Sequence, residues 1–144
     1  MDALYERCAG LDVHKKTVTV CLIVPGPDGR PKKEIRTFGT MTEDLLNLSR
    51  WLSEAGCTHV AMESTGVFWK PVYNILEGSF EVILANARDI KNVPGRKTDV
   101  SDAEWIADLL RHGLIRGSFV PEKPMRELRH LTWFRTSLIR ERAS

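Results

Sequence analysis

The sequence of 144 residues has few cysteines, little net charge and no long apolar segment. Its three cysteines form no CxxC pair and its four histidines show no HxxxH or HExxH spacing, which argues against a structural zinc site. No apolar run approaches the roughly 18 residues that a membrane-spanning helix needs, and residues 1–15 lack the apolar core of a secretory signal. We therefore expect a cytoplasmic protein with free thiols.

The charge is small in total but unevenly distributed. Lys and Arg number 21 against 19 Asp and Glu, in a chain that is 42% hydrophobic and 28% charged, as globular domains are. Residues 1–110 hold 13 basic and 16 acidic residues, whereas residues 111–144 hold 8 basic and 3 acidic ones. This asymmetry predicts a folded, slightly acidic body and a basic tail that faces a polyanion.

The spacing of apolar residues predicts three strands, then alternating helices and strands. Residues 40–43 (TMTE) fit a capping box that opens a helix ending near Gly56. The predicted strands cover 8–13, 17–24, 33–38, 58–63 and 80–84, and further helices cover 69–77 and 100–111, with a polar loop over 86–98. This order predicts an α/β fold whose sheet has antiparallel and parallel parts and carries helices on its faces.

A basic helix is expected from about residue 125 to the end. Its apolar residues recur near a 3.5-residue spacing, which is typical of a coiled coil: Leu128, Leu131, Phe134 and Leu138. Because this seam still continues at Ser144, we expect the chain to be part of a longer protein. We therefore expect one domain over residues 1–120 and the start of a coiled-coil helix over 121–144.

Four acidic residues occupy unusual places. Asp12 and Glu63 each end an apolar strand, and Asp99 and Asp102 open the helix after the polar loop. If the first and fourth strands are neighbours, Asp12 and Glu63 meet at one edge of the sheet. Two carboxylates about 4 Å apart repel by roughly 4 kcal/mol at an effective dielectric near 20, so protons or cations must neutralise them. Mg²⁺ and Mn²⁺ prefer such oxygen ligands, and a pair of these ions supports phosphoryl transfer.

Each acidic residue also has a simpler interpretation. Asp12 can hydrogen-bond the turn that follows it. Asp99 can be a helix N-cap with Asp102 at the third helical position, where the helix dipole favours a negative charge. Glu63 is the hardest to explain in this way, because a strand end seldom buries a carboxylate without a partner.

Three motifs resemble the N-terminal domain of the DEDD transposases of insertion-sequence family one hundred and ten. They are GLDVHK at 10–15, MESTG at 62–66 and KTDVSDA at 97–103, and the resemblance covers nearly the whole chain. It implies a RuvC-like, ribonuclease-H-like fold. It also implies that Asp12, Glu63, Asp99 and Asp102 are catalytic residues that bind one or two Mg²⁺ or Mn²⁺ ions.

The resemblance further implies an enzyme, a DNA transposase or recombinase that cuts and rejoins DNA under the guidance of a structured bridge RNA. The expected partners are DNA, this RNA and further copies of the protein, held as a dimer or higher assembly through the coiled coil. The family's nucleophilic serine belongs to a C-terminal domain outside these residues. We therefore expect this chain alone to be inactive in full recombination.

Basic residues near the motifs suggest nucleic-acid contacts. Arg96 and Lys97 border the loop before Asp99, and Arg126, Arg129 and Arg135 lie on the predicted C-terminal helix. Arginine donates two parallel hydrogen bonds to a phosphate, and release of counterions favours such binding. The alternatives are a solvated loop and a solvated coiled-coil exterior. The four tryptophans are expected to be packing residues, and His14 is expected to be a surface imidazole.

Three other functions remain open. A RuvC-like nuclease would use the same carboxylates to hydrolyse DNA with water. A non-catalytic nucleic-acid-binding or oligomerisation module would use them only as caps. An actin-like ATPase also begins with a hairpin that carries an Asp, but it needs small residues in the turn, and residues 13–16 (VHKK) contain no glycine.

Overall fold

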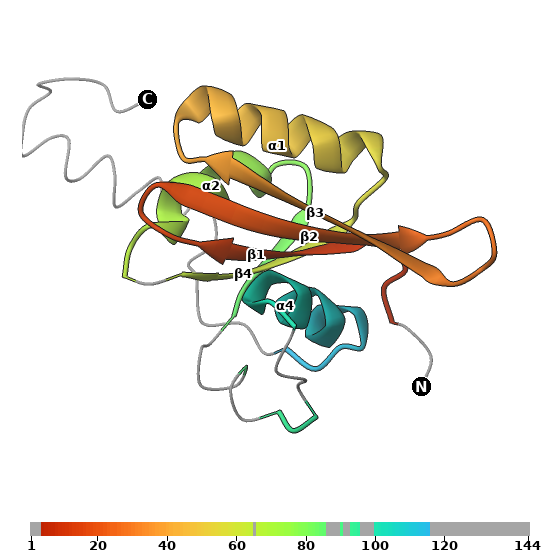
Figure 1. Cartoon of the computed structure of the whole chain (residues 1–144). Helices are drawn as coiled ribbons and strands as arrows, with labels where there is room; N and C mark the ends of the chain where they lie inside the picture. The colour runs from red at the N-terminus through yellow and green to blue at the C-terminus, as the bar shows by residue number, and fades with distance from the viewer. Residues whose placement is uncertain (1–3, 65, 86–89, 91–92, 96–99, 116–144) are drawn as a thin grey trace, which may run out of the picture.

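The computed structural model describes residues 4–64, 66–85, 90, 93–95 and 100–115, and its elements follow the predicted order (Figure 1). The bounds are β1 Cys8–Val13, β2 Thr17–Pro25, β3 Pro31–Gly39, α1 Thr42–Glu54, β4 His59–Ser64, α2 Trp69–Leu76, β5 Glu81–Leu84 and α4 Asp102–Arg111. Most of the predicted 86–98 loop and the whole predicted C-terminal helix lie outside the described residues.

The five strands form one mixed sheet in the order β3-β2-β1-β4-β5. The β1–β2 and β2–β3 pairs are antiparallel, whereas the β1–β4 and β4–β5 pairs are parallel. Helices α1 and α2 cover one face and α4 covers the other (Figure 1). The predicted fold class, a mixed sheet flanked by helices, is therefore confirmed.

Side-chain alternation in β1 assigns each residue to one face of the sheet. Ala9, Leu11 and Val13 are fully buried in the core under α1 and α2. Cys8 belongs to the second core, under α4. Since Gly10 and Asp12 share the parity of Cys8, they also face α4.

Gly10 lets α4 lie directly on the sheet. A Cβ atom at this position would clash with the backbone nitrogen of Ala107 and would lie 2.5 Å from the backbone oxygen of Ala103. On the outer strand β3, Lys33 Nζ donates hydrogen bonds to Glu104 Oε2 and Asp108 Oδ2 of α4, both at 3.0 Å. Close backbone packing and an ion pair thus fix the helix in place.

The predicted capping box at 40–43 is wrong. Helix α1 begins at Thr42 with Met41 as its N-cap, and no side chain caps it. The Thr40 hydroxyl instead donates a 3.1 Å hydrogen bond to the backbone oxygen of Lys15, so it fastens the turn between β1 and β2. The end of the helix agrees with the prediction, since Gly56 has φ of +75° and follows the C-cap.

The remaining expectations about single residues are largely met. Cys8, Cys21 and Cys57 are free and buried. Trp105 is buried and its Nε1 donates to the backbone oxygen of Ile90 at 3.2 Å, as expected of a packing residue. Within the described ranges, no helix is both long and apolar enough to cross a membrane.

Candidate functional site

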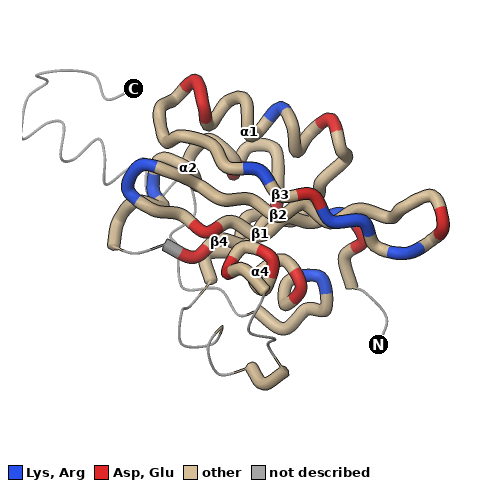
Figure 2. Tube along the Cα trace, in the orientation of Figure 1, with Lys and Arg blue, Asp and Glu red and all other residues tan. Residues whose placement is uncertain are grey.

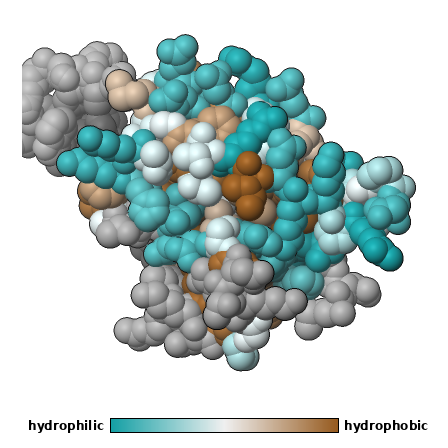
Figure 3. Space-filling view, viewed as in Figure 1, coloured by the Kyte–Doolittle hydropathy of each residue, from teal (hydrophilic) through white to brown (hydrophobic). Residues whose placement is uncertain are grey.

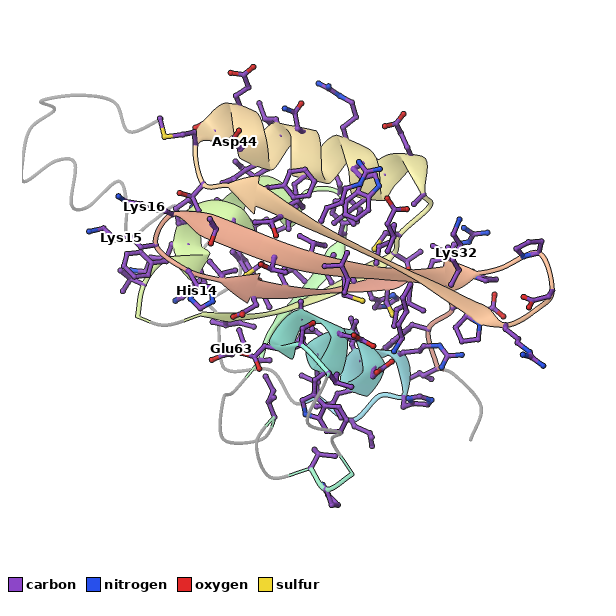
Figure 4. All side chains as sticks on the ribbon, in the orientation of Figure 1. His14, Lys15, Lys16, Lys32, Asp44 and Glu63 are labelled. Atoms are coloured by element: carbon purple, nitrogen blue, oxygen red, sulfur yellow. The ribbon has the colours of Figure 1, made fainter. Side chains whose placement is uncertain are left out.

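Asp12 and Glu63 stand opposite each other in the sheet. The parallel register of β1 and β4 pairs Asp12 with Glu63, two residues after it pairs Gly10 with Ala61. Ala61 belongs to the core under α4, so alternation directs Glu63, like Asp12, to the α4 face. Figure 4 shows Glu63 on the side of the sheet that α4 covers. The predicted meeting of the two strand-borne carboxylates is therefore confirmed, and their catalytic role stays a prediction.

The Asp12 carboxylate is in contact with His14. Asp12 Oδ2 lies 3.0 Å from His14 Nε2, and the side chains are 15% and 53% exposed, respectively. The turn is closed by the His14 backbone N–H, which donates to the Thr17 backbone oxygen at 2.8 Å. His14 is thus exposed, as expected, but its contact with Asp12 was not predicted. The signal for it was the two-residue spacing of the pair at the start of a hairpin turn.

Helix α4 directs its N-terminus toward the same edge. Cys8 Sγ is 3.9 Å from the Ala107 backbone oxygen, and Gly10 lies against both Ala103 and Ala107. Residues later in β1 therefore lie nearer to the start of α4, so Asp12 is on the side of the helix N-terminus, where Asp102 is exposed. Figure 2 shows acidic segments at the ends of β1 and β4 and on α4. The partial positive charge of a helix N-terminus favours carboxylates at this position.

Ser101, and not Asp99, caps α4. Its hydroxyl accepts a 3.2 Å hydrogen bond from the Glu104 backbone N–H, and Asp102 is the first helical residue. The interpretation of Asp99 as N-cap with Asp102 at the third helical position is therefore wrong. A serine hydroxyl three residues before a backbone N–H makes the cap without using either aspartate.

The other predicted site residues fall outside the described part of the chain: Asp99, Arg96, Lys97, Arg126, Arg129 and Arg135. Among the residues that are described, no group of three or more His, Cys, Asp or Glu side chains is arranged to hold a metal ion. What the sheet supplies is one adjacent carboxylate pair, Asp12 and Glu63. Two hard oxygen donors fit part of the coordination that Mg²⁺ or Mn²⁺ prefers.

Comparison with known proteins gives one family match and several likenesses to solved structures. The family model DEDD_Tnp_IS110, described as a transposase, matches residues 9–144. RuvC of T. thermophilus in complex with a Holliday junction substrate is 11% identical, with a TM-score of 0.49 over 78% of this chain and 99% of that one. Fowlpox virus resolvase in complex with Holliday junction DNA is 13% identical, with a TM-score of 0.42 over 64% and 65%. No curated protein matches the chain.

Proposed function

Because the chain belongs to the DEDD transposase family, we propose that the Asp12–Glu63 edge is part of the metal-dependent catalytic centre of a domain that cuts and rejoins DNA. The observation that supports this most directly is the register of β1 and β4, which pairs the two carboxylates on the α4 face. Neighbouring carboxylates repel each other, and a divalent cation relieves that repulsion.

The proposed ligands of one or two Mg²⁺ or Mn²⁺ ions are Asp12, Glu63, Asp99 and Asp102. The bound metal would supply Lewis-acid polarisation of the scissile phosphate. Asp12 and Glu63 contribute oxygen ligands from a rigid sheet. His14 orients the Asp12 carboxylate through its contact with Oδ2, and the Ser101 cap fixes the residue at which α4 begins.

The finer parts of the proposal concern residues beyond the described ones. We propose that a serine outside this chain is the nucleophile, that a structured RNA guides the choice of DNA, and that the C-terminal helix joins copies of the protein. Arg96, Lys97, Arg126, Arg129 and Arg135 would bind phosphates of the DNA or RNA, since a planar guanidinium and a lysine ammonium both pair with phosphate oxygens.

Mn²⁺ titration by calorimetry tests the proposed metal site. We expect Asp12→Asn and Glu63→Gln each to weaken Mn²⁺ binding at least tenfold, with an unchanged far-ultraviolet circular dichroism spectrum. Glu81→Gln is the matched control, because Glu81 is exposed and begins β5 at the opposite end of the parallel strands. Unchanged Mn²⁺ affinity in both site variants would contradict the proposal and support a non-catalytic binding module.

An incubation of this chain with Mn²⁺ and labelled branched or duplex DNA separates the proposed reaction from hydrolysis. We expect no cleaved strands, because the proposed nucleophile is not among these residues. If the chain releases free strand ends and Asp12→Asn abolishes their formation, water is the nucleophile and the hydrolytic RuvC-like alternative is correct.

A further inference from the structure

We propose that the segments leaving β1 and β4 form a binding surface for a single DNA strand, which we call the edge surface: Lys15, Lys16, Trp69 and Lys70. This inference rests on the proposed function, since the surface would lead a strand to the Asp12–Glu63 pair. Phosphates would bind the lysines, and a base would stack on the tryptophan.

The sheet register brings the two segments together. Val13 pairs with Val18 on one side and with Ser64 on the other, so the chain leaves β1 and β4 at adjacent points. The exit from β1 is the turn at 14–16. The exit from β4 leads into α2, whose first residue, Trp69, packs against the core that contains Val13 and Val18. Figure 1 shows α2 beside the turn that connects β1 to β2.

The β1–β2 turn is held in place and directs two cations outward. Hydrogen bonds fix its backbone at 2.8 Å, from His14 to Thr17, and at 3.1 Å, from Thr40 to Lys15. The Lys15 and Lys16 side chains are exposed and extend away from the sheet (Figure 4). Within the described residues neither of them forms an ion pair, whereas Lys33 pairs with two carboxylates. The two ammonium groups are therefore available to a phosphate.

The start of α2 adds an aromatic ring and a third cation. Lys70 Nζ lies 6.0 Å from the centroid of the Trp69 ring, and Trp69 meets Tyr73 edge to face at 5.8 Å. Trp69 is part-exposed, and the neighbouring Val67 is 61% exposed. In the space-filling view, hydrophilic side chains at this end of the molecule lie next to a small hydrophobic spot (Figure 3). An aromatic ring flanked by lysines is the combination that binds a single strand with little sequence preference.

The charges of the edge set an order of events. Without a cation, Asp12 and Glu63 repel a phosphate, while the three lysines of the edge surface attract it. On this proposal the lysines would hold the strand first, and a divalent cation held by Asp12 and Glu63 would neutralise the charge that otherwise keeps phosphates away. Hence removal of the two negative charges should strengthen DNA binding when no metal is present.

Fluorescence anisotropy with a labelled 12-nucleotide single-stranded DNA in EDTA, at 50 to 200 mM salt, tests the edge surface. We expect the Lys15→Ala/Lys16→Ala double variant to bind about tenfold more weakly, with a salt slope smaller by about 1.4, or about 0.7 for each lost phosphate contact. Arg30→Ala/Lys32→Ala is the matched control, because it removes the same charge from exposed residues at the other end of β2 and β3, where Figure 4 labels Lys32. The control should stay within twofold of the unmodified chain. Equal losses in the two double variants would overturn the proposal.

Three further measurements complete the test. Trp69→Leu, which keeps an apolar side chain, should weaken DNA binding about fivefold. Lys70→Ala should weaken it two- to fivefold. If neither variant changes DNA binding, the part of the proposal assigned to α2 is wrong. Asp12→Asn/Glu63→Gln should bind DNA more tightly than the unmodified chain in EDTA, and equal or weaker binding would contradict the proposed path. An RNA of the same sequence that binds tenfold more tightly than the DNA would overturn the assignment of DNA as the ligand.

The outcome is separable from that of the proposed metal site. Lys15→Ala/Lys16→Ala should bind Mn²⁺ with unchanged affinity, whereas Asp12→Asn should lose it. If Asp12→Asn loses Mn²⁺ binding but the lysine variants bind DNA as the unmodified chain does, the proposed function stands and the edge surface is wrong. The opposite pattern would keep the edge surface and lose the metal site.

Discussion

Asp12 and Glu63 face each other because each is the fifth residue of its strand and the two strands run parallel in phase. Cys8 pairs with His59, so every later residue of β1 meets its counterpart in β4. A shift of one residue would move one carboxylate to the opposite face of the sheet, among the apolar residues under α1 and α2. The hydrophobic residues on that face, such as Leu11 and Met62, therefore fix the register that brings the acids together.

Burial controls the chemistry of the three cysteines. Burial is the main cause that raises the pKa of Cys8 to about 11 and the pKa of Cys21 and Cys57 to about 12. The reactive thiolate is therefore scarce in the folded protein at pH 8. We expect a disulfide reagent that releases a chromophore to label the native chain negligibly within minutes and all three thiols in guanidinium chloride. Rapid labelling of one native cysteine would contradict the buried placement.

The same pKa shifts predict how stability depends on pH. The unfolded thiols titrate near pH 8.5, whereas the folded ones titrate near pH 11 to 12. Between these values the folded state binds more protons, so the free energy of unfolding falls as the pH rises, by at most about 1.4 kcal/mol per pH unit for each thiol. Urea unfolding at pH 8 and pH 10 measures this fall, and Cys57→Ala should reduce it. A variant with the same pH dependence as the unmodified chain would show that other groups cause the fall.

The hydroxyl of Ser101 should make a measurable contribution to stability. Since it accepts the Glu104 N–H at 3.2 Å, Ser101→Ala leaves that donor without its cap and should lower the free energy of unfolding by about 1 kcal/mol. Ser53→Ala, at an exposed position within α1, is the control and should change stability by less than about 0.5 kcal/mol. Urea unfolding measures both variants, and equal effects would argue against the cap.

At the scale of the elements, the sequence predicted what depends on nearby residues. The two-residue period of apolar side chains predicted β1 and β2 to within a few residues. The helical spacing of Leu45, Leu48 and Leu52 predicted α1 equally well. The predicted capping box does not form, because α1 begins at Thr42 and the Thr40 hydroxyl donates to the backbone oxygen of Lys15, which is distant in sequence. The bonds from Lys33 to α4 span 71 and 75 residues, and no local pattern signals them.

The meeting of Asp12 and Glu63 was predictable for a different reason. Both acids end apolar strands, and their convergence required only that the two strands be neighbours. The chain forms β2, β3 and α1 before it returns as β4 beside β1, so this adjacency was a condition of the prediction and not a result of it. The position of α4 was not predictable in this way, because it depends on contact between the Gly10 backbone and the helix backbone. The proposed contribution of Asp102 to the site depends on that contact.

Gly10→Ala tests how closely α4 must approach the sheet. The added methyl group would meet the backbone of Ala103 and Ala107, and backbone atoms cannot rotate away as a flexible side chain can. We expect a loss of about 3 kcal/mol in the free energy of unfolding. Gly78→Ala is the control, because nothing lies within 4 Å of its added Cβ. Urea unfolding of both variants is the measurement, and a loss below about 1 kcal/mol in Gly10→Ala would contradict the close packing.

At the scale of the whole molecule, the fold concentrates opposite charges at one edge of the sheet. The carboxylates lie on the α4 face, while the turn at 14–16 and the start of α2, which follow the same ends of β1 and β4, carry exposed lysines. The apolar cores on the two faces of the sheet hold both groups on rigid elements. Packing around the strands thus holds the two neighbouring acidic residues in place, and a cation binding at that pair should stabilise the folded state.

Stability measured with and without metal therefore tests the charge arrangement of the whole molecule. A ligand that binds only the folded state adds about 2.7 kcal/mol at a concentration one hundred times its dissociation constant. We expect Mn²⁺ to raise the free energy of unfolding of the unmodified chain by about this amount and to leave that of Asp12→Asn/Glu63→Gln unchanged. Urea unfolding in EDTA and in Mn²⁺ gives all four values. An equal gain from Mn²⁺ in both proteins would place the metal away from the β1–β4 edge.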